Sequence, residues 1–312
     1  MKLASGPITL STPEAPFPVL LRQRMSDYVT LTKPRIAVMV LITVGAGYLM
    51  GAGMSAKLAP MIHTLLGAGL VAAGASAWNM WIERDTDTRM RRTANRPLPA
   101  GRLHHLEVVV FGTAIAVTGV NYLWHALPTP YAAIVSAITF ISYVAIYTPL
   151  KPVTTWNTVI GAIPGALPPV IGWYAAKGEI GLGGVAIFLV LFTWQLPHFM
   201  AIAWMYRQEY AKAGHLMLPV VDETGRRTSR AMIVWCVLLI VSSLLPVMRA
   251  DFQLADVSYA FGAIFCGVLF LLSTLKFSRE RTDKQARQVL QVSILYLPAV
   301  MALLMVHAFL LG

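Results

Sequence analysis

Long apolar stretches alternate with short polar ones along most of this chain. Nine of the stretches are each about long enough to cross the hydrocarbon core of a bilayer as a helix. They cover residues 36–54, 61–82, 106–124, 131–148, 157–176, 181–204, 231–248, 257–275 and 292–311. The pattern therefore predicts an all-α protein, a polytopic membrane helix bundle of about nine transmembrane helices around a cavity.

The beginning of the chain has a different pattern. Residues 1–20 are rich in proline, serine and threonine, and no apolar core follows a basic start, so the segment is not a signal peptide. We expect a disordered tail over residues 1–25, followed by a single transmembrane domain over residues 26–312. Pro34 stands where the first turn of a helix can begin.

Composition supports a membrane location. Hydrophobic residues make up 57% of the chain and charged residues 12%, and the mean hydropathy is +0.64. Such a chain cannot cover its surface with polar groups, so its partner is the lipid bilayer. The formal charge of +11 would suggest nucleic acid for a soluble protein, but here it reflects the Lys and Arg excess that fixes orientation, and we expect no nucleic-acid partner.

The basic residues gather on every second connection between the apolar stretches. Of 25 basic residues, only Lys57, Lys177 and Arg249 fall on the other connections. This bias predicts an odd number of spans with the N-terminus cytoplasmic and the C-terminus on the opposite, periplasmic side. The long polar connections 83–105 and 205–230 fall on the cytoplasmic side, so we expect the cavity to open there.

The segment from Trp78 to Pro99 carries the clearest candidate chemistry. Asn79, Glu83 and Asp87 are spaced i, i+4 and i+8, which places them along one face of a helix end. Two carboxylates and a carboxamide oxygen in one stripe are ligands of the kind that Mg²⁺ prefers. Asp85 falls on the opposite side of the same helix.

Several arginines follow this stripe, and together they suggest a polyanionic ligand. They are Arg89, Arg91, Arg92 and Arg96. Acids and arginines side by side suit a diphosphate bridged by a metal ion. The alternative is a helix end that is merely solvated by pairs of opposite charges one turn apart.

Two further features lie after residue 194. A polar cluster on the cytoplasmic connection contains Tyr206, Arg207, Glu209, Tyr210, Lys212 and His215. Glu209 is either a second acid facing the first stripe or a surface acid at a helix end. His198 lies beside Pro197 within a predicted span, where ionisable groups are costly and often functional. The alternative is a neutral histidine that is hydrogen-bonded to a neighbouring helix.

Longer strings of residues resemble a known family. The run NMWIERDTDTRMRRTANRPLPAG, residues 79–101, resembles the first aspartate-rich motif of the UbiA-type intramembrane prenyltransferases. Within that superfamily, YTPLKPVTTWNTVIGAIPGALPPVIGW (147–173) and WQLPHFMAIAWMYRQEYAKAGHLMLPVV (194–221) resemble the protohaem IX farnesyltransferases, or haem O synthases. The motifs extend over roughly residues 31–221.

The resemblance implies an activity and its partners. It implies transfer of a farnesyl group from farnesyl diphosphate to a vinyl group of haem B, with water addition, giving haem O. Mg²⁺ is the implied cofactor, and haem B and farnesyl diphosphate are the implied substrates. The implied location is the bacterial inner membrane, with haem A synthase or another oxidase assembly factor as a possible partner for the product.

The resemblance also implies roles for single residues. Asn79, Glu83 and Asp87 match the metal-binding positions of the first motif, although family members commonly have Asp at the position of Glu83. The family usually has adjacent acids in the second motif, where this chain has Gln208 and Glu209, so only Glu209 is carried over as a metal ligand.

Other side chains are candidates for contacts with the two substrates. Arg92, Arg96 and Lys151 are candidates for binding the diphosphate, and the two arginines share a helix face if the helix continues that far. His198 is a candidate for lining the haem cavity, either as a hydrogen-bond donor or as a transient contact to iron.

Three other functions compete with this one. A second UbiA-type prenyltransferase, acting on a quinone precursor or chlorophyllide, would share the first motif, and only the 147–173 and 194–221 strings favour haem. A secondary transporter would also explain many spans and the prolines of segment 157–173. However, the acids and arginines lie at helix ends rather than at mid-membrane. A haem-binding module without catalysis would not need the acid and arginine stripe.

Overall fold

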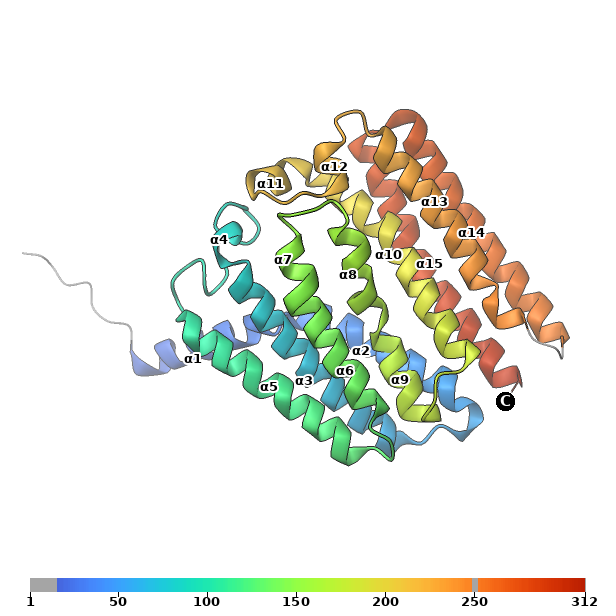
Figure 1. The fold of residues 1–312 in the computed structure, drawn as a ribbon, viewed down its shortest axis with the longest axis horizontal. Helices are drawn as coiled ribbons and strands as arrows, with labels where there is room; N and C mark the ends of the chain where they lie inside the picture. Colours follow the sequence, from blue (N-terminus) through green and yellow to red (C-terminus); the bar gives the residue numbers. More distant parts are fainter. Residues whose placement is uncertain (1–15, 249–251, 312) are drawn as a thin grey trace, which may run out of the picture.

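The computed structural model describes residues 16–248 and 252–311, and within those ranges it contains helices and no strand (Figure 1). Nine helices of the described chain are long and apolar enough to cross a membrane. The predicted all-α, polytopic architecture is therefore confirmed. Residues 1–15, where most of the expected tail falls, lie outside the described residues.

The spanning segments are single helices or helices that follow one another with little interruption. In chain order they are α2 (Pro34–Ala52) with η1 (Gly53–Ser55), α3 (Leu58–Ile82), α5 (His105–Ala126), α6 (Tyr131–Ile141) with η2 (Ser142–Tyr147) and α7 (Thr148–Leu150), α8 (Asn157–Ala166) with α9 (Pro168–Lys177), α10 (Leu182–Met205), α13 (Arg226–Ser243) with η3 (Leu245–Val247), α14 (Leu254–Glu280) and α15 (Asp283–Leu311). The remaining helices are α1 (Phe17–Leu31), α4 (Arg84–Asp87), α11 (Arg207–Lys212) and α12 (Leu218–Val221).

Part of the segment expected to be a disordered tail is helical. Residues 17–25 were assigned to the tail, but they form the first part of α1, whose first turn tolerates proline. Two ion pairs fasten this helix to the bundle. Arg24 contacts Glu107 of α5 at 2.7 Å, and the buried Asp27 accepts a hydrogen bond from Arg102 at 2.9 Å.

The first half of the bundle is packed closely at glycines. A Cβ atom at Gly47 of α2 would lie 1.9 Å from the carbonyl oxygen of Pro169, and one at Gly172 of α9 would lie 1.9 Å from that of Val44. Only glycine allows the two backbones to approach so closely. The second half has a conventional apolar core, in which the side chains of Leu239, Phe270 and others are fully buried.

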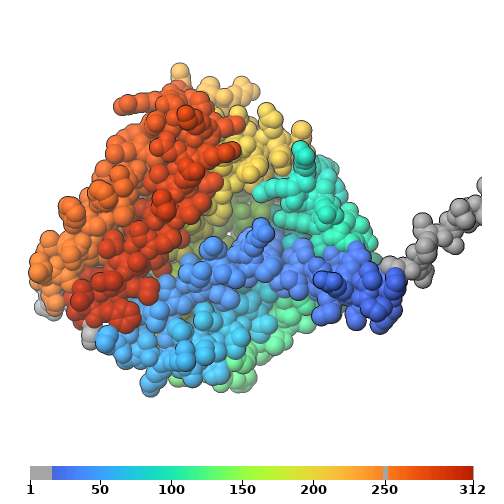
Figure 2. Space-filling view, turned by 180° about the vertical axis from the view of Figure 1, so that it is seen from behind, coloured from blue at the N-terminus to red at the C-terminus, as the bar shows by residue number. Residues whose placement is uncertain are grey.

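The short helices α4, α11 and α12 all lie at one end of the bundle (Figure 1). Seen from behind, the surface is hollowed between the blue helix α2, the red helix α15 and the teal segment around residues 85–105 (Figure 2). The polar connections that carry the candidate chemistry therefore gather at one end of the bundle.

Candidate active site

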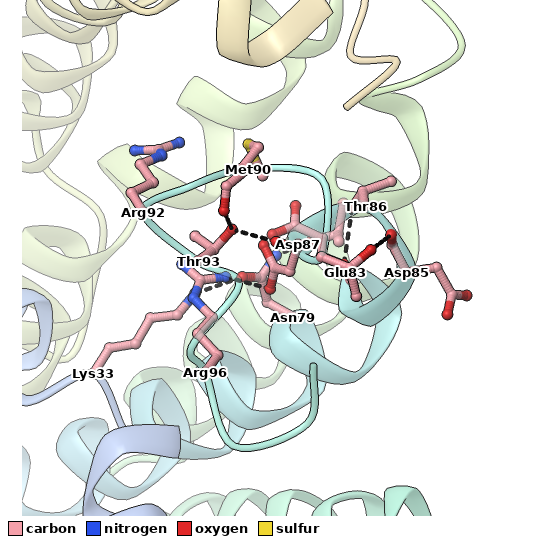
Figure 3. A network of polar contacts seen from close by, with 12 residues as sticks. Lys33, Asn79, Glu83, Asp85, Thr86, Asp87, Met90, Arg92, Thr93 and Arg96 are labelled. Carbon is pink, nitrogen blue, oxygen red and sulfur yellow. Dashed lines mark hydrogen bonds and ion pairs between the residues drawn. The ribbon is translucent and has the colours of Figure 1, made fainter. Parts of the chain in front are cut away.

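The acidic stripe lies at the junction of α3 and α4. Backbone hydrogen bonds keep the helical register across the junction, from Glu83 N–H to the Asn79 carbonyl (3.0 Å) and from Asp87 N–H to the Glu83 carbonyl (2.8 Å). The structure thus brings these three buried side chains to the same region, as the spacing predicted (Figure 3). Asp85 points away from them, with 78% of its side chain exposed beside Arg84.

A different cation holds each member of the stripe. The Lys33 ammonium donates to Asn79 Oδ1 at 2.5 Å, and Arg96 donates to Asp87 Oδ2 at 2.6 Å. Lys151 forms the third pair, with Glu83 Oε1. The three cations come from the start of α2, the end of α7 and the loop after α4. Segments far apart in the sequence therefore close around one small polar region.

Burial and charge act against each other here. Burial would raise the pKa of Glu83, but Lys151 and Lys33 outweigh it and lower the pKa to about 2. Burial lowers the pKa of Lys151, but Glu83 outweighs it and the pKa lies above its usual value. Burial, with help from Arg96, lowers the pKa of Lys33 to about 7. For Asp87, burial outweighs the pairing with Arg96 and raises the pKa. The Glu83–Lys151 pair therefore stays charged at neutral pH.

A π-helical segment, η2, leads into the residues that face the stripe. Asn79 Nδ2 donates to Thr148 Oγ1 at 3.2 Å, and the Thr148 hydroxyl donates to the Tyr143 carbonyl at 2.8 Å. The Lys151 ammonium lies 4.8 Å from the centre of the Tyr147 ring. Such π-helical turns are frequent at functional sites, and this one sets the direction of α7 and of Lys151.

The loop after α4 turns back on itself, so the helix does not continue far enough for Arg92 and Arg96 to share one of its faces. Helix α4 ends at Asp87, and the Thr93 hydroxyl then donates to the Asp87 carbonyl at 2.9 Å. Arg96 consequently returns to Asp87. Arg92 instead reaches the second polar cluster and donates to the Tyr210 hydroxyl at 2.9 Å.

The second polar cluster therefore lies against the first. Besides its hydrogen bond, Arg92 lies over the rings of Tyr206 and Tyr210, at 5.6 and 5.1 Å from their centres. Glu209 lies in α11 between these two tyrosines, and its Oε2 atom is buried without a hydrogen-bond partner in the described structure. The approach of the connections 83–105 and 205–230 is thus visible in the contacts of Arg92.

The oxygen atoms of these two clusters fit Mg²⁺ when it is shared with a ligand. Asp87 Oδ1, like Glu209 Oε2, is buried and has no hydrogen-bond partner among the described residues. No group of three or more His, Cys, Asp or Glu side chains within the described ranges is arranged to hold a metal ion alone. Mg²⁺ commonly binds through one or two carboxylates together with substrate phosphates, which suits this arrangement.

His198 lies apart from the stripe, on α10 where it faces α15. Its Nδ1 atom is 2.7 Å from the hydroxyl oxygen of Ser293, and its ring stacks on Trp194 with the ring centres 4.6 Å apart. The Trp194 indole also donates to the Ser293 carbonyl at 2.8 Å. The histidine is thus hydrogen-bonded to a neighbouring helix and only partly buried.

Sequence reasoning missed Lys33, Thr148 and Tyr147. Lys33 lies three residues before the first apolar stretch, and a lysine at the start of a span is a usable signal for a cation at the membrane surface. It adopts a left-handed backbone conformation, with φ of 48°, as it enters α2. Thr148 and Tyr147 give no such signal, because they resemble ordinary residues of an apolar span.

The fold and this geometry agree with a match to a family model. The model of the UbiA prenyltransferase family matches residues 40–305. The chain belongs to the UbiA prenyltransferase family. The predicted family and the predicted class of enzyme, a prenyltransferase, are thereby confirmed.

Relatives of this UbiA family member include several curated bacterial proteins. It is 42% identical over 290 residues to the protoheme IX farnesyltransferase of Solibacter usitatus (strain Ellin6076), which covers 90% of this chain and 98% of that protein. It is 41% identical over 284 residues to the protein of the same name from Salinibacter ruber (strain DSM 13855 / M31), covering 91% and 99%.

Solved structures of the UbiA type share the fold at low sequence identity. A digeranylgeranylglyceryl phosphate synthase superposes with a TM-score of 0.77 at 18% identity, over 92% of this chain and 99% of that one. A UbiA homologue from Archaeoglobus fulgidus, solved with GPP and Mg²⁺, superposes with a TM-score of 0.61 at 17% identity, over 89% and 99%. These matches establish the fold of the chain.

Proposed function

We propose that this chain transfers a farnesyl group from farnesyl diphosphate to a vinyl group of haem B in a Mg²⁺-dependent reaction, and that water addition then gives haem O. The observation that carries the proposal is the pairing of Asn79, Glu83 and Asp87, each with its own partly buried cation. A site built from oxygen ligands and cations in equal number suits a diphosphate bridged by a metal ion. The relatives named protoheme IX farnesyltransferase suggest the acceptor and the length of the donor.

The proposed metal ligands are Asn79, Glu83, Asp87 and Glu209. Two of their oxygens, Asp87 Oδ1 and Glu209 Oε2, are buried and have no protein partner in the described structure. When bound, Mg²⁺ supplies positive charge that stabilises the departing diphosphate. Asn79 is the neutral member of the set, so it contributes an oxygen without adding to the charge repulsion between the carboxylates.

The proposed diphosphate ligands are Lys151, Arg96 and Arg92. Lys151 and Arg96 neutralise Glu83 and Asp87, because an unpaired buried carboxylate is costly. With Mg²⁺ held by Glu83 and Asp87, both cations would be available to phosphate oxygens. Donors already fixed in position need no reorganisation as charge builds up on the leaving group.

The bonds and charges of the proposed reaction balance without a protein nucleophile. The C–O bond of farnesyl diphosphate breaks and its electron pair leaves with the diphosphate. The π electrons of the haem vinyl group form the new C–C bond, water adds to the resulting cation, and a proton is released to solvent. The apolar surroundings of the site protect the farnesyl cation from water until the vinyl group attacks.

The proposed contact to haem is His198. Its bond to Ser293 fixes Nδ1 and leaves Nε2 available for a hydrogen bond or a transient contact to iron. The haem absorption spectrum and haem affinity of the His198→Ala variant should therefore differ from those of the parent. An unchanged spectrum and affinity in a folded variant would assign the residue to helix packing alone.

The proposed location is the bacterial inner membrane, with the N-terminus cytoplasmic, the C-terminus periplasmic and the cavity open to the cytoplasm. Residues 26–312 would form one transmembrane domain. The basic residues on alternate connections support this orientation. The product would pass to haem A synthase or another factor of oxidase assembly.

Competition between acceptors tests the proposed function against its nearest alternative. Purified protein with farnesyl diphosphate and Mg²⁺ is offered equal concentrations of haem B, an aromatic quinone precursor and chlorophyllide. Mass spectrometry should find the prenyl group on haem. Prenylation of the quinone precursor or chlorophyllide instead would identify a different UbiA-type activity.

A further inference from the structure

His215 lies in the loop between α11 and α12, and the backbone fixes its position firmly. Its own N–H donates to the Tyr210 carbonyl at 2.9 Å, and the next residue, Leu216, donates to the Lys151 carbonyl at 2.8 Å. The Asn157 side chain donates to the Leu216 carbonyl at 2.9 Å. These bonds tie the loop to the turn that carries Lys151.

The imidazole of His215 is buried but unused. Only 4% of the residue is exposed, and neither ring nitrogen has a hydrogen-bond partner within the described part of the chain; Nδ1 is fully buried. A buried polar group without a partner costs free energy, so such groups in folded proteins usually have a partner or a functional role. No described side chain supplies that partner.

The charged groups around His215 are those of the candidate active site. Burial lowers the pKa of His215; Lys151 and Arg92 also lower it, and Glu83 opposes them. The imidazole is therefore neutral at pH 7 and carries one N–H that can donate. With Lys151 and Arg92 among its neighbours, the imidazole is better suited to binding a negatively charged oxygen than a further cation.

We propose that His215 donates a hydrogen bond to the diphosphate of the prenyl donor, beside Lys151 and Arg92. The inference rests on the proposed function, because it assumes that a diphosphate binds at this site. The histidine follows Glu209 by six residues, in the second polar cluster, where the chain has a single acid before Asp222. It would add a neutral donor to the three cations on the phosphate side of the site.

Binding of an unreactive analogue tests this contact. Farnesyl thiodiphosphate is titrated by calorimetry, with Mg²⁺ present, into the purified full-length parent and into His215→Leu, His215→Gln and His215→Asn. Loss of a hydrogen bond to a charged group should weaken binding by about tenfold or more in His215→Leu. At least one amide variant, each of which keeps an N–H donor, should recover most of the affinity. His105→Leu, at an exposed position of α5, is the matched control and should bind like the parent.

The outcomes separate the two proposals. If the parent does not bind the analogue, the proposed function fails. If the parent binds and His215→Leu binds equally well, the role of His215 fails while the proposed function stands. Equal weakening in the Leu, Gln and Asn variants would also overturn the proposed hydrogen bond. The amide variants keep an N–H donor, so equal weakening would show that His215 acts through its shape and packing alone.

A second measurement on the unmodified protein does not depend on variants folding. The protein is labelled with ¹⁵N-histidine and the analogue is added. ¹⁵N–³¹P distance measurements should then find one histidine ring nitrogen close to the bound phosphorus, and the resonance of that nitrogen should shift when the analogue binds. Absence of any histidine ring nitrogen near the phosphorus would overturn the contact.

Discussion

At the scale of single residues, buried charges of opposite sign neutralise one another at the candidate active site. Asp87 is fully buried, and Arg96 is its ion-pair partner. Removing one member of such a pair leaves the other charge buried and uncompensated, which is more costly than losing a surface pair. Substitutions in the stripe should therefore disturb the charge balance as well as the proposed metal binding.

Substitution of Asp87 gives the sharpest residue-scale prediction. Asp87→Ala should lower the rate of prenyl transfer by about 100- to 1,000-fold, since a charge-stabilising group at a reacting centre is removed. Haem binding should stay near that of the parent, because the haem contact proposed for His198 is on α10, away from the stripe. Product formation by mass spectrometry and haem titration measure the two effects.

Asp85→Ala is the matched control, two residues away on the same short helix. Its exposed side chain contacts only Arg84 among the described ion pairs, and exposed pairs contribute little. Its rate should stay within a few-fold of the parent. Equal losses of rate in Asp85→Ala and Asp87→Ala would show that the acids contribute only negative charge to the region. The position of Asp87 on the same helix face as Asn79 and Glu83 would then not matter.

The residue spacing predicts part of this site and not the rest. The helical interval places Asn79, Glu83 and Asp87 on one side, and backbone hydrogen bonds across the junction preserve it. Their partners Lys33 and Lys151 lie 46 and 68 residues away from Asn79 and Glu83. No local pattern identifies such pairs, because they depend on how the helices pack.

At the scale of helices, α2 packs closely against α9 through the second half of α2. A Cβ atom at Gly47 would lie 1.9 Å from a backbone oxygen of α9. Backbone atoms cannot move aside as a flexible side chain can. The pair of helices must separate if this glycine is replaced.

Gly47→Ala should therefore destabilise the bundle, by roughly 1–3 kcal/mol for overpacking of this kind. Gly45→Ala, two residues earlier, is the control, because its Cβ would meet only Leu65 at 3.8 Å. Alanine also favours the helix, so that variant should unfold at the parent's temperature or above. Thermal unfolding in detergent distinguishes them, and equal unfolding temperatures would contradict the packing described.

Apolar length predicts where the helices cross but not how far they extend. The stretch expected at residues 292–311 belongs to α15, which begins nine residues earlier at Asp283. Polar residues there continue the helix beyond the apolar part, after Arg281 ends α14 in a left-handed conformation. The π-helical segment at Ser142–Tyr147 is also unpredictable, because its sequence matches an ordinary apolar helix.

At the scale of the whole molecule, hydropathy and charge determine most of the architecture. Nine spanning helices in the described chain match the nine predicted stretches, since length and apolarity decide which segments cross a bilayer. The break between α8 and α9 and the hollow beside α2 and α15 depend on tertiary packing (Figure 2). The break falls at Pro168, so the prolines of segment 157–173 do signal it, whereas no linear pattern predicts the hollow.

Accessibility of introduced cysteines tests the orientation. In a background with Cys236→Ala and Cys266→Ala, an impermeant thiol reagent should label Ser55→Cys in intact cells but should label Glu223→Cys only after permeabilisation. Both positions are exposed, and they lie on connections assigned to opposite sides. The reverse pattern would place the candidate active site on the periplasmic side.

The most direct test of the central claim is the mass of the product formed from haem B and farnesyl diphosphate. The purified protein is incubated with both compounds and Mg²⁺ in ¹⁸O-labelled water, with a chelator-treated sample as the reference. We predict a haem that has gained one farnesyl group and one hydroxyl group, with the label in the hydroxyl and no product after chelation. A haem of unchanged mass, or a product formed equally well with the chelator, would contradict the account.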